Sequence, residues 1–166
     1  MRSLFALLSI IGVVGLGALA SSAVADVIAK SESRSPAIAS LSDVTRIRAG
    51  DINCRHCDLS GADLSNQCVK NGDLTGANFD RVTARYMCMS LANFTDATFR
   101  NADLTGANLG QSVLKNADMT GAKLNIASIK GADLSTAKGL IQAQIDLACG
   151  DAKTKLPPGL HVKSCS

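Results

Sequence analysis

The feature that most constrains this chain is a five-residue period that runs without interruption through about half of it. Residues 57–136 divide into 16 consecutive units of five residues with no insertion. The third residue is large and apolar in 15 of the 16 units, Ala84 being the exception, while the first is Ala in ten and the second is Asp or Asn in nine. Such a period matches neither the repeat of about 3.6 residues in an α-helix nor that of about 2 in a β-strand, so it indicates stacked coils.

The geometry of such a coil follows from what has to be buried. If each unit forms one side, the third residue and the small first residue point inward while the other three face water. With four sides per coil, residues 20 apart stack, and all four inward columns are then apolar; one column reads Leu59, Phe79, Phe99 and Met119. At Val82 and Ala84 the large and small inward residues have changed places, which keeps the buried volume nearly constant. Gln67 is an inward polar residue, which we interpret as a structural irregularity of the first full coil.

The composition of the units carries a family resemblance. An Ala, then Asp or Asn, then Leu recurs in units such as Ala62-Asp63-Leu64-Ser65-Asn66 and Ala102-Asp103-Leu104-Thr105-Gly106. This pattern resembles the pentapeptide-repeat proteins, and the resemblance covers residues 47–138. It implies an all-β solenoid, a right-handed quadrilateral β-helix of about four to five coils. It leaves function open, because that family includes nucleic-acid mimics that protect DNA gyrase, targeting scaffolds and exported proteins without known activity.

Charge and composition restrict what such a rod could do. The chain has 17 Lys and Arg against 14 Asp and Glu, and residues 57–136 hold eight Asp, no Glu and seven Lys or Arg. This balance lacks both the carboxylate coat of a nucleic-acid mimic and the basic field of a nucleic-acid binder, so the mimic is a minor alternative and no nucleic-acid partner is expected. Four Phe and one Tyr are too few for an aromatic core, which predicts one narrow aliphatic domain.

Residues 1–25 have the pattern of an export signal. Arg2 gives a basic start, residues 4–20 are apolar, and Ala23-Val24-Ala25 ends in the small-x-small pattern that predicts cleavage before Asp26. An uncleaved membrane anchor is the alternative, because the apolar run reaches the lower limit of a spanning helix. Cleavage predicts a periplasmic or secreted protein without a stable membrane span. The six cysteines all follow the signal, which suits an oxidising compartment.

Both ends of the repeat region need caps, because open coil ends expose apolar interior and unpaired strand edges. Residues 26–46 are predicted to be a flexible or capping segment, with Leu41, Val44 and Ile47 closing the first coil. Residues 47–138 form the predicted β-helix. Residues 139–166 form the C-terminal cap and tail, in which the apolar spacing over 140–149, before Gly150, predicts a capping α-helix.

Cysteine spacing gives specific structural predictions. Cys68 and Cys88 occupy the same second position 20 residues apart. The register therefore stacks them about 4.8 Å apart, within the range that a disulfide accepts, and we predict a Cys68–Cys88 bond. Cys149 and Cys165 are a second candidate pair, which would tie the tail to the cap. Cys54 and Cys57 remain, and they allow a structural disulfide or packed thiols, a redox site, or part of a metal site.

No catalytic, cofactor-binding or metal-binding constellation is expected. His56 and His161 are the only histidines, and the second-position Asp and Asn residues are predicted to accept hydrogen bonds from the adjacent turn backbone. The preferred function is therefore a non-catalytic exported scaffold that binds a protein or a cell-envelope component through a rigid face. The alternative is a periplasmic redox or metal-handling protein that uses Cys54 and Cys57.

The candidate partner surface consists of residues that break the repeat template. Arg and Tyr residues are favoured at interface centres. Here they replace the small residues of neighbouring units at Arg81, Arg85, Tyr86 and Arg100. A solvated variable patch is the other interpretation of these residues. Rods of this kind can also pair end to end or face to face, so a homodimer is an expected form of assembly.

Overall fold

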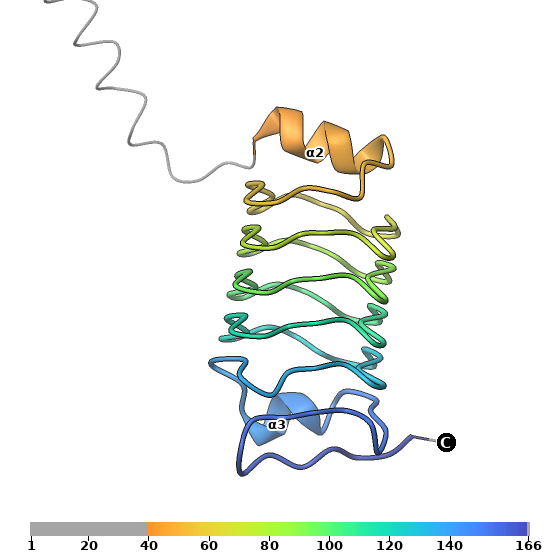
Figure 1. Cartoon of the computed structure of the whole chain (residues 1–166), viewed down its shortest axis with the longest axis vertical. Helices are drawn as coiled ribbons and strands as arrows, with labels where there is room; N and C mark the ends of the chain where they lie inside the picture. The colour runs from red at the N-terminus through yellow and green to blue at the C-terminus, as the bar shows by residue number, and fades with distance from the viewer. Residues whose placement is uncertain (1–39, 166) are drawn as a thin grey trace, which may run out of the picture. The chain divides into compact units, whose positions relative to one another are not determined.

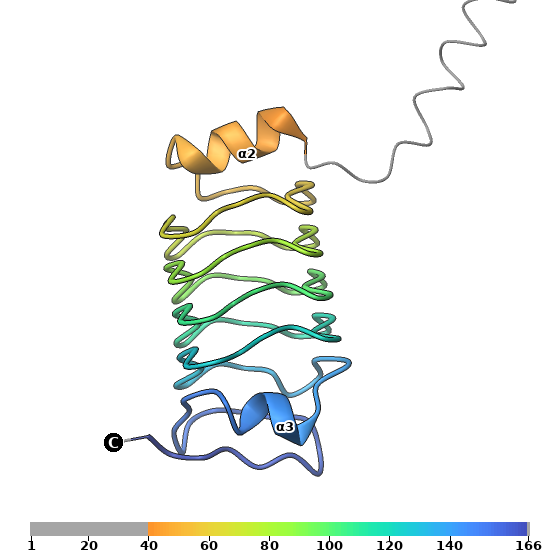
Figure 2. The ribbon, with the colours of Figure 1, turned by 180° about the vertical axis from the view of Figure 1, so that it is seen from behind.

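The computed structural model describes residues 40–165 as a rod of stacked coils between two short helices (Figure 1). Helix α2 spans Leu41–Arg48 and lies over the first coil, while helix α3 spans Gln142–Ile145 beyond the last regular coil. The view from behind shows the same stack (Figure 2). The predicted signal peptide, residues 1–25, lies outside the described residues, as do residues 26–39. Within residues 40–165 we find no helix with the length and apolar character that crossing a membrane requires.

The coils stack in the register that the five-residue period predicts. Parallel β-bridges join each second-position residue to the residue 20 further on, from Asn53 with Asp73 through to Asp118 with Lys138. Four units of five residues therefore make one coil, and the chain forms short parallel ladders on four sides. The predicted stacking of 20-residue coils is confirmed.

Each corner of a coil is a tight turn. The third residue of a unit accepts a hydrogen bond from the first N–H of the next unit, as in Ala62 N to Leu59 O at 3.1 Å. Every fifth position from residue 56 to residue 131 has positive φ, as the third residue of a type II turn requires. In all nine units with Asp or Asn at the second position, that side chain accepts the fourth residue's N–H, as in Thr95 N to Asn93 Oδ1 at 3.1 Å. The turn role predicted for these side chains is confirmed.

The interior is filled by the third-position residues. Phe79 and Phe99, one coil apart, stack with ring centroids 4.8 Å apart, and Phe94 packs edge-on against both. Val82 and Ala84 are both buried, so the exchange of large and small inward residues holds. Gln67 is only half-buried at the N-terminal end, where water can reach part of its side chain.

Helix α2 closes the N-terminal end with part of the predicted set. Val44 and Ile47 are buried against the core, whereas Leu41 is 81% exposed, so its predicted closing role is wrong. The helix spans one face only, and Leu41 in its first turn points away from the coil. Residues 47 and 48, predicted to begin the solenoid, belong to this helix, and Arg48 donates from its guanidinium to Asp63 O at 2.8 Å.

The helix of the C-terminal cap is shorter than the apolar spacing predicts. Helix α3 has four residues instead of the ten over 140–149, because the chain returns to the ladder directly after it. Leu147 O accepts from Ile126 N at 2.7 Å, and Cys149 N donates to Ala127 O at 2.7 Å. Pairing with the open edge of the last coil satisfies backbone groups that an extended helix would leave unpaired. Gln144 anchors the helix by donating to Met119 O and Ala122 O.

Candidate interaction surface

The four sides of the rod differ in charge. One side comprises residues 67–71, 87–91, 107–111 and 127–131, and we call it the acid-free face. It carries Lys70 and Lys130 and no Asp or Glu, whereas the other three sides share all eight Asp residues of the repeats. An acid-free face favours the approach of an anionic or electron-rich group.

A column with three exposed apolar side chains and one glycine borders the acid-free face, and we call it the apolar corner: Tyr86, Gly106, Ile126 and Leu147. These residues follow one another down successive coils, because Ile126 N donates to Leu147 O and the ring of Tyr86 lies against Gly106. Tyr86 is 59% exposed, Ile126 67% and Leu147 53%. Leu91, 45% exposed, stands at the opposite edge of the same face. Clustered exposed apolar side chains of this kind mark interaction surfaces.

The backbone at three of these positions is strained. Tyr86, Leu91 and Ile126 have φ of 55°, 61° and 52°, in the left-handed region that other corners fill mostly with Gly, Asn or Asp. A bulky or β-branched residue there costs about 1–2 kcal/mol. Both this strain and the exposure of apolar surface oppose folding and solubility, so the three side chains do not serve the stability of the coil.

The four predicted partner-surface residues are all exposed but do not form one flat patch. Arg100 lies on one side, Arg81 at the next corner, and Arg85 and Tyr86 on the following side. Arg85 Nε lies 3.7 Å from an oxygen of Asp103, and Arg100 Nε lies 3.1 Å from one of Asp80. These ion pairs reduce the positive charge that Arg85 and Arg100 offer to a partner. Only Tyr86 belongs to the apolar corner.

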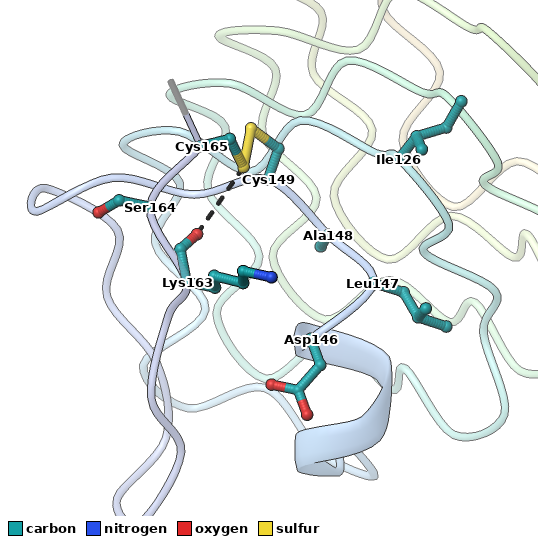
Figure 3. Close-up of a pocket in the computed structure, with 8 residues that line it drawn as sticks. All are labelled: Ile126, Asp146, Leu147, Ala148, Cys149, Lys163, Ser164 and Cys165. Carbon is teal, nitrogen blue, oxygen red and sulfur yellow. Dashed lines mark hydrogen bonds between the residues drawn. A yellow bond between two sulfur atoms is a disulfide. The ribbon is translucent and has the colours of Figure 1, made fainter.

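A shallow depression of about 550 Å³ opens at the C-terminal end of the apolar corner (Figure 3). Ile126 and Leu147 lie along one side of it, and Lys163, Ser164 and Cys165 lie along the other. The depression extends the apolar corner into the cap. An inserted side chain could contact both apolar and basic groups there.

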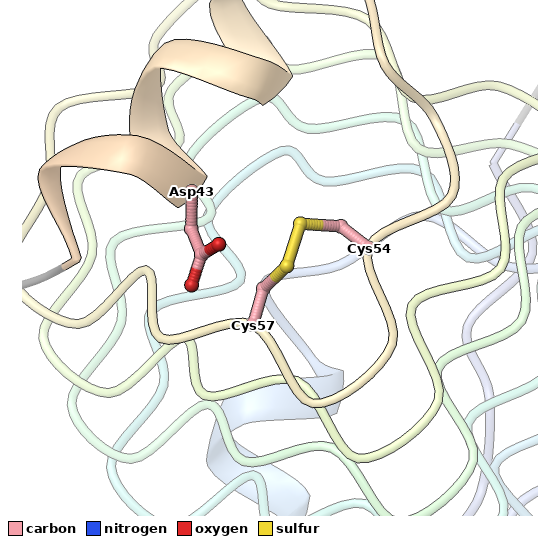
Figure 4. Close-up of side chains that lie close together, drawn as sticks. All are labelled: Asp43, Cys54 and Cys57. Carbon is pink, nitrogen blue, oxygen red and sulfur yellow. A yellow bond between two sulfur atoms is a disulfide. The ribbon is translucent and has the colours of Figure 1, made fainter.

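Cys54 and Cys57 form a disulfide beneath α2 (Figure 4). Their exposed fractions are 1% and 4%. The Asp43 carboxylate of α2 lies within 4.8 Å of both sulfur atoms, and Asp43 also accepts from Asp58 N at 3.1 Å. Bonded to each other and covered by α2, the two sulfurs staple one turn of the first coil, and the bond does not reach the helix itself.

The other four cysteines lie on the acid-free face or at its C-terminal end. Cys149 and Cys165 form a disulfide that joins the cap to the tail. Cys68 and Cys88 are bridge partners on neighbouring coils, as their spacing predicts, but they are free thiols here. The predicted register of this pair is therefore present while the bond is not, and the bond stays a prediction.

The apolar corner was missed in the sequence. Its signal is present in part, since Tyr86 and Ile126 are fifth-position residues 40 apart and the 20-residue register places them in one column. Leu147 lies beyond the repeats, where the register shifts: Ser128 pairs with Cys149, 21 residues on. No extrapolation of the five-residue period places Leu147 in that column.

The repeats match a known family. Residues 57–96 and 92–135 match the sequence model for pentapeptide repeats, in eight copies. No functionally curated protein has a sequence that matches this chain significantly.

Several solved structures are similar to it. A pentapeptide repeat protein from the thylakoid lumen of Arabidopsis thaliana is 30% identical over 47% of this chain and 54% of its own, with a TM-score of 0.39, so the match spans about half of that protein. One from Nostoc PCC 7120 is 29% identical over 76% of this chain and 93% of its own, with a TM-score of 0.36. One from the cyanobacterium Cyanothece 51142 is 19% identical over 69% and 97%, with a TM-score of 0.41.

The matched residues are those whose coils stack in 20-residue register, with the third-position residues buried and the turns closed at the fifth. By its repeats this chain belongs to the pentapeptide-repeat family.

Proposed function

We propose that this protein is an exported, non-catalytic scaffold that binds a protein or cell-envelope partner through the apolar corner and the acid-free face. The observation that carries the proposal is the exposure of Tyr86 and Ile126 in left-handed backbone conformations. A partner that buried these side chains would remove their apolar surface from water. This burial would stabilise the complex by about 25 cal/mol for each Å² of apolar area covered. Export is supported by the signal pattern of residues 1–25.

The positive charge of the surface favours a partner that carries negative charge. Lys70 and Lys130 lie on the acid-free face, and Lys163 lines the depression at its C-terminal end. A partner surface with an apolar centre and carboxylates around it would complement this arrangement. Arg85 lies on the neighbouring side, Arg81 at the far corner of that side, and Arg100 on the side opposite the acid-free face, so only a partner that wraps around the rod would contact all three.

An alternative function uses Cys54 and Cys57 for redox or metal handling, and the nearby Asp43 supports it. Reduction of the disulfide would give two thiolates and a carboxylate within 4.8 Å, a donor set that suits Zn²⁺. The burial of both sulfurs argues against access by a partner thiol. Thiol titration of the native protein together with metal analysis separates this alternative from the scaffold.

The scaffold is tested by capture with matched variants. The immobilised chain is exposed to the exported protein fraction of its source organism, and bound proteins are quantified by mass spectrometry. We expect the double variant Tyr86→Asn, Ile126→Asn to lose its partner at least about tenfold, the usual effect of removing central anchors. The control is Leu41→Ser, which removes an exposed apolar side chain from α2. Equal capture by all three proteins would refute the proposed surface.

A further charge test uses Arg81→Glu with Arg85→Glu. If the partner surface extends over that side, reversing both charges weakens capture and changes its salt dependence. Unchanged capture would show that Arg81 and Arg85 do not contact the partner. The role of the apolar corner would then be decided by the Tyr86 and Ile126 variants alone.

A further inference from the structure

We propose that Cys68 and Cys88 form a thiol–disulfide exchange site on the acid-free face, whose substrate is the disulfide of a small molecule or of a protein. The two residues are parallel bridge partners on neighbouring coils, with Val69 N donating to Cys88 O at 2.8 Å and Cys88 N donating to Gln67 O at 2.9 Å. Neighbouring strands are about 4.8 Å apart, so a bond between these cysteines requires no movement of the backbone.

The repeated turn supplies a hydrogen-bond donor to the sulfur. In nine other units the fourth residue's N–H donates to an Asp or Asn oxygen at the second position, as in Thr105 N to Asp103 Oδ1 at 3.1 Å. Cys68 takes the Asp position in its unit, next to the N–H of Lys70, and Cys88 takes it one coil further on, next to the N–H of Ser90. An N–H aimed at an acceptor stabilises a thiolate as it does a carboxylate. The turn that is structural elsewhere therefore favours a thiolate at both sulfurs here.

The two sulfurs differ in access and acidity. Cys68 is exposed, and the hydrogen bonds from the Cys88 thiol and from Lys70 N–H lower the pKa of Cys68 below its usual 9.0. Cys88 is half-buried, and its burial, followed by the Cys68 contact, raises the pKa of Cys88. Because a substrate can reach the exposed Cys68 more easily than the half-buried Cys88, Cys68 is the attacking residue and Cys88 the resolving residue.

The exchange balances as two thiolate displacements. The Cys68 thiolate attacks a substrate disulfide RSSR, forming a Cys68–S–S–R bond and releasing RS⁻, which takes up the proton that Cys68 lost. Cys88 then loses its proton to the solvent and attacks the Cys68 sulfur, forming the Cys68–Cys88 bond and releasing the second RS⁻, which takes up a proton from the solvent. Two protein thiols are oxidised by two electrons, and one disulfide is reduced to two thiols. The surrounding face carries no carboxylate, so an anionic disulfide meets no like charge there.

The site is tested on the whole protein with oxidised glutathione as the probe. The starting thiols are checked by peptide mapping, so that only Cys68 and Cys88 begin reduced. We expect the wild type to gain a Cys68–Cys88 linked peptide that reduced glutathione reverses. We expect Cys88→Ser to accumulate one glutathione on Cys68, and Cys68→Ser to react at Cys88 about tenfold more slowly. A second arm uses an oxidised Cys-x-x-Cys protein: faster exchange in this arm assigns protein disulfides as the substrate, and slower exchange assigns small molecules.

Lysine variants separate activation from simple exposure. Lys70→Gln should slow the attack of Cys68 about threefold, because it removes a positive charge two residues from the sulfur. Lys115→Gln is the matched control, since Lys115 occupies the same place in its unit on another side of the rod, and the rate of this variant should be unchanged. Preferential modification of Cys88, absence of the linked peptide, or a linked pair that reduced glutathione cannot open would each overturn the proposal.

Discussion

At the scale of single residues, the fifth position of each unit has a backbone conformation that disfavours large side chains. The corner requires positive φ, which Gly and Asn adopt with little strain and bulky residues do not. Tyr86, Leu91 and Ile126 nevertheless occupy such corners. These side chains therefore have a role other than stabilising the coil. Replacing one of them by a residue that the turn prefers tests this conclusion.

We expect Ile126→Asn to raise the free energy of unfolding by about 1 kcal/mol, because it relieves a β-branched residue at φ 52°. Urea unfolding monitored by circular dichroism measures this change. The reverse substitution, Asn71→Ile at φ 62°, should lower the free energy of unfolding by a similar amount. A loss of stability in Ile126→Asn would show that the isoleucine contributes packing that outweighs its strain.

The second-position carboxylates make stability depend on pH. Hydrogen bonds from Thr105, Thr120 and Ser135 lower the pKa of Asp103, Asp118 and Asp133 below the usual 3.8. A depressed folded-state pKa contributes stability that is fully present above the unfolded value and is lost as the pH falls through the folded value. We therefore expect the free energy of unfolding to be level above about pH 5 and to decrease below about pH 4.

Asn residues at the same position of other units provide a control for this pH effect. Asn78, Asn93 and Asn108 accept the same turn bond without a charge. The triple variant Asp103→Asn, Asp118→Asn, Asp133→Asn should be about 1 kcal/mol less stable than wild type at pH 7, through loss of surface ion pairs. Urea titrations from pH 7 to pH 2 should show this difference shrinking towards zero. A constant difference would mean that these carboxylates do not govern the acid transition.

At the scale of the structural element, the corner is a turn on which the preceding coil's side chain rests. The ring of Tyr86 covers Gly106, and the imidazole of His56 covers Gly76. Glycine at these positions provides both the positive φ and the space for the side chain above. Neighbouring corners are thus packed against each other even at the surface.

Two glycines with nearly equal φ allow the need for positive φ to be measured separately from the need for space. At Gly61, φ +68°, an added methyl group meets nothing within 4 Å, whereas at Gly106, φ +69°, it lies 2.5 Å from the Tyr86 ring. Gly61→Ala should lower the free energy of unfolding by about 1 kcal/mol through backbone strain alone. Gly106→Ala should lower it further, and Tyr86→Ala should recover part of the extra loss. Equal losses in both variants would show that the ring moves aside freely.

At the scale of the whole molecule, a solenoid holds together by contacts between neighbouring coils, so its ends limit its stability. The C-terminal end departs from the repeat: after α3 the chain pairs with the last coil at Cys149, then crosses to Lys155 beside Asp133. The Cys149–Cys165 disulfide closes this irregular segment. It is therefore the covalent link between cap and tail.

Removing that link should destabilise the cap first. We expect Cys149→Ser with Cys165→Ser to lower the free energy of unfolding by about 3 kcal/mol, given a separation of 16 residues. Hydrogen exchange should become faster at Ile126 and Ile129 N–H, which donate to Leu147 and Cys149, while the Phe79–Phe99 region stays protected. Cys68→Ser, which removes a free thiol, is the control. Uniformly faster exchange along the rod would contradict a locally closed cap.

The register, the buried columns and the turn bonds followed from the sequence by itself. They depend on a period in which each unit repeats the same local choice, an apolar third residue and a turn-forming fifth, so that one unit predicts the next. The placement of Phe79 over Leu59 and of Cys68 beside Cys88 required no knowledge beyond the 20-residue spacing.

The ends and the surface were decided only by the tertiary structure. The burial of Ile47 but not Leu41, the four-residue length of α3 and the alignment of Leu147 with Ile126 all depend on contacts with coils far away in the chain. Outside the repeats no period carries the register forward. There the open edge of the last coil selects which backbone groups pair with it, and that pairing determines which side chains face the solvent.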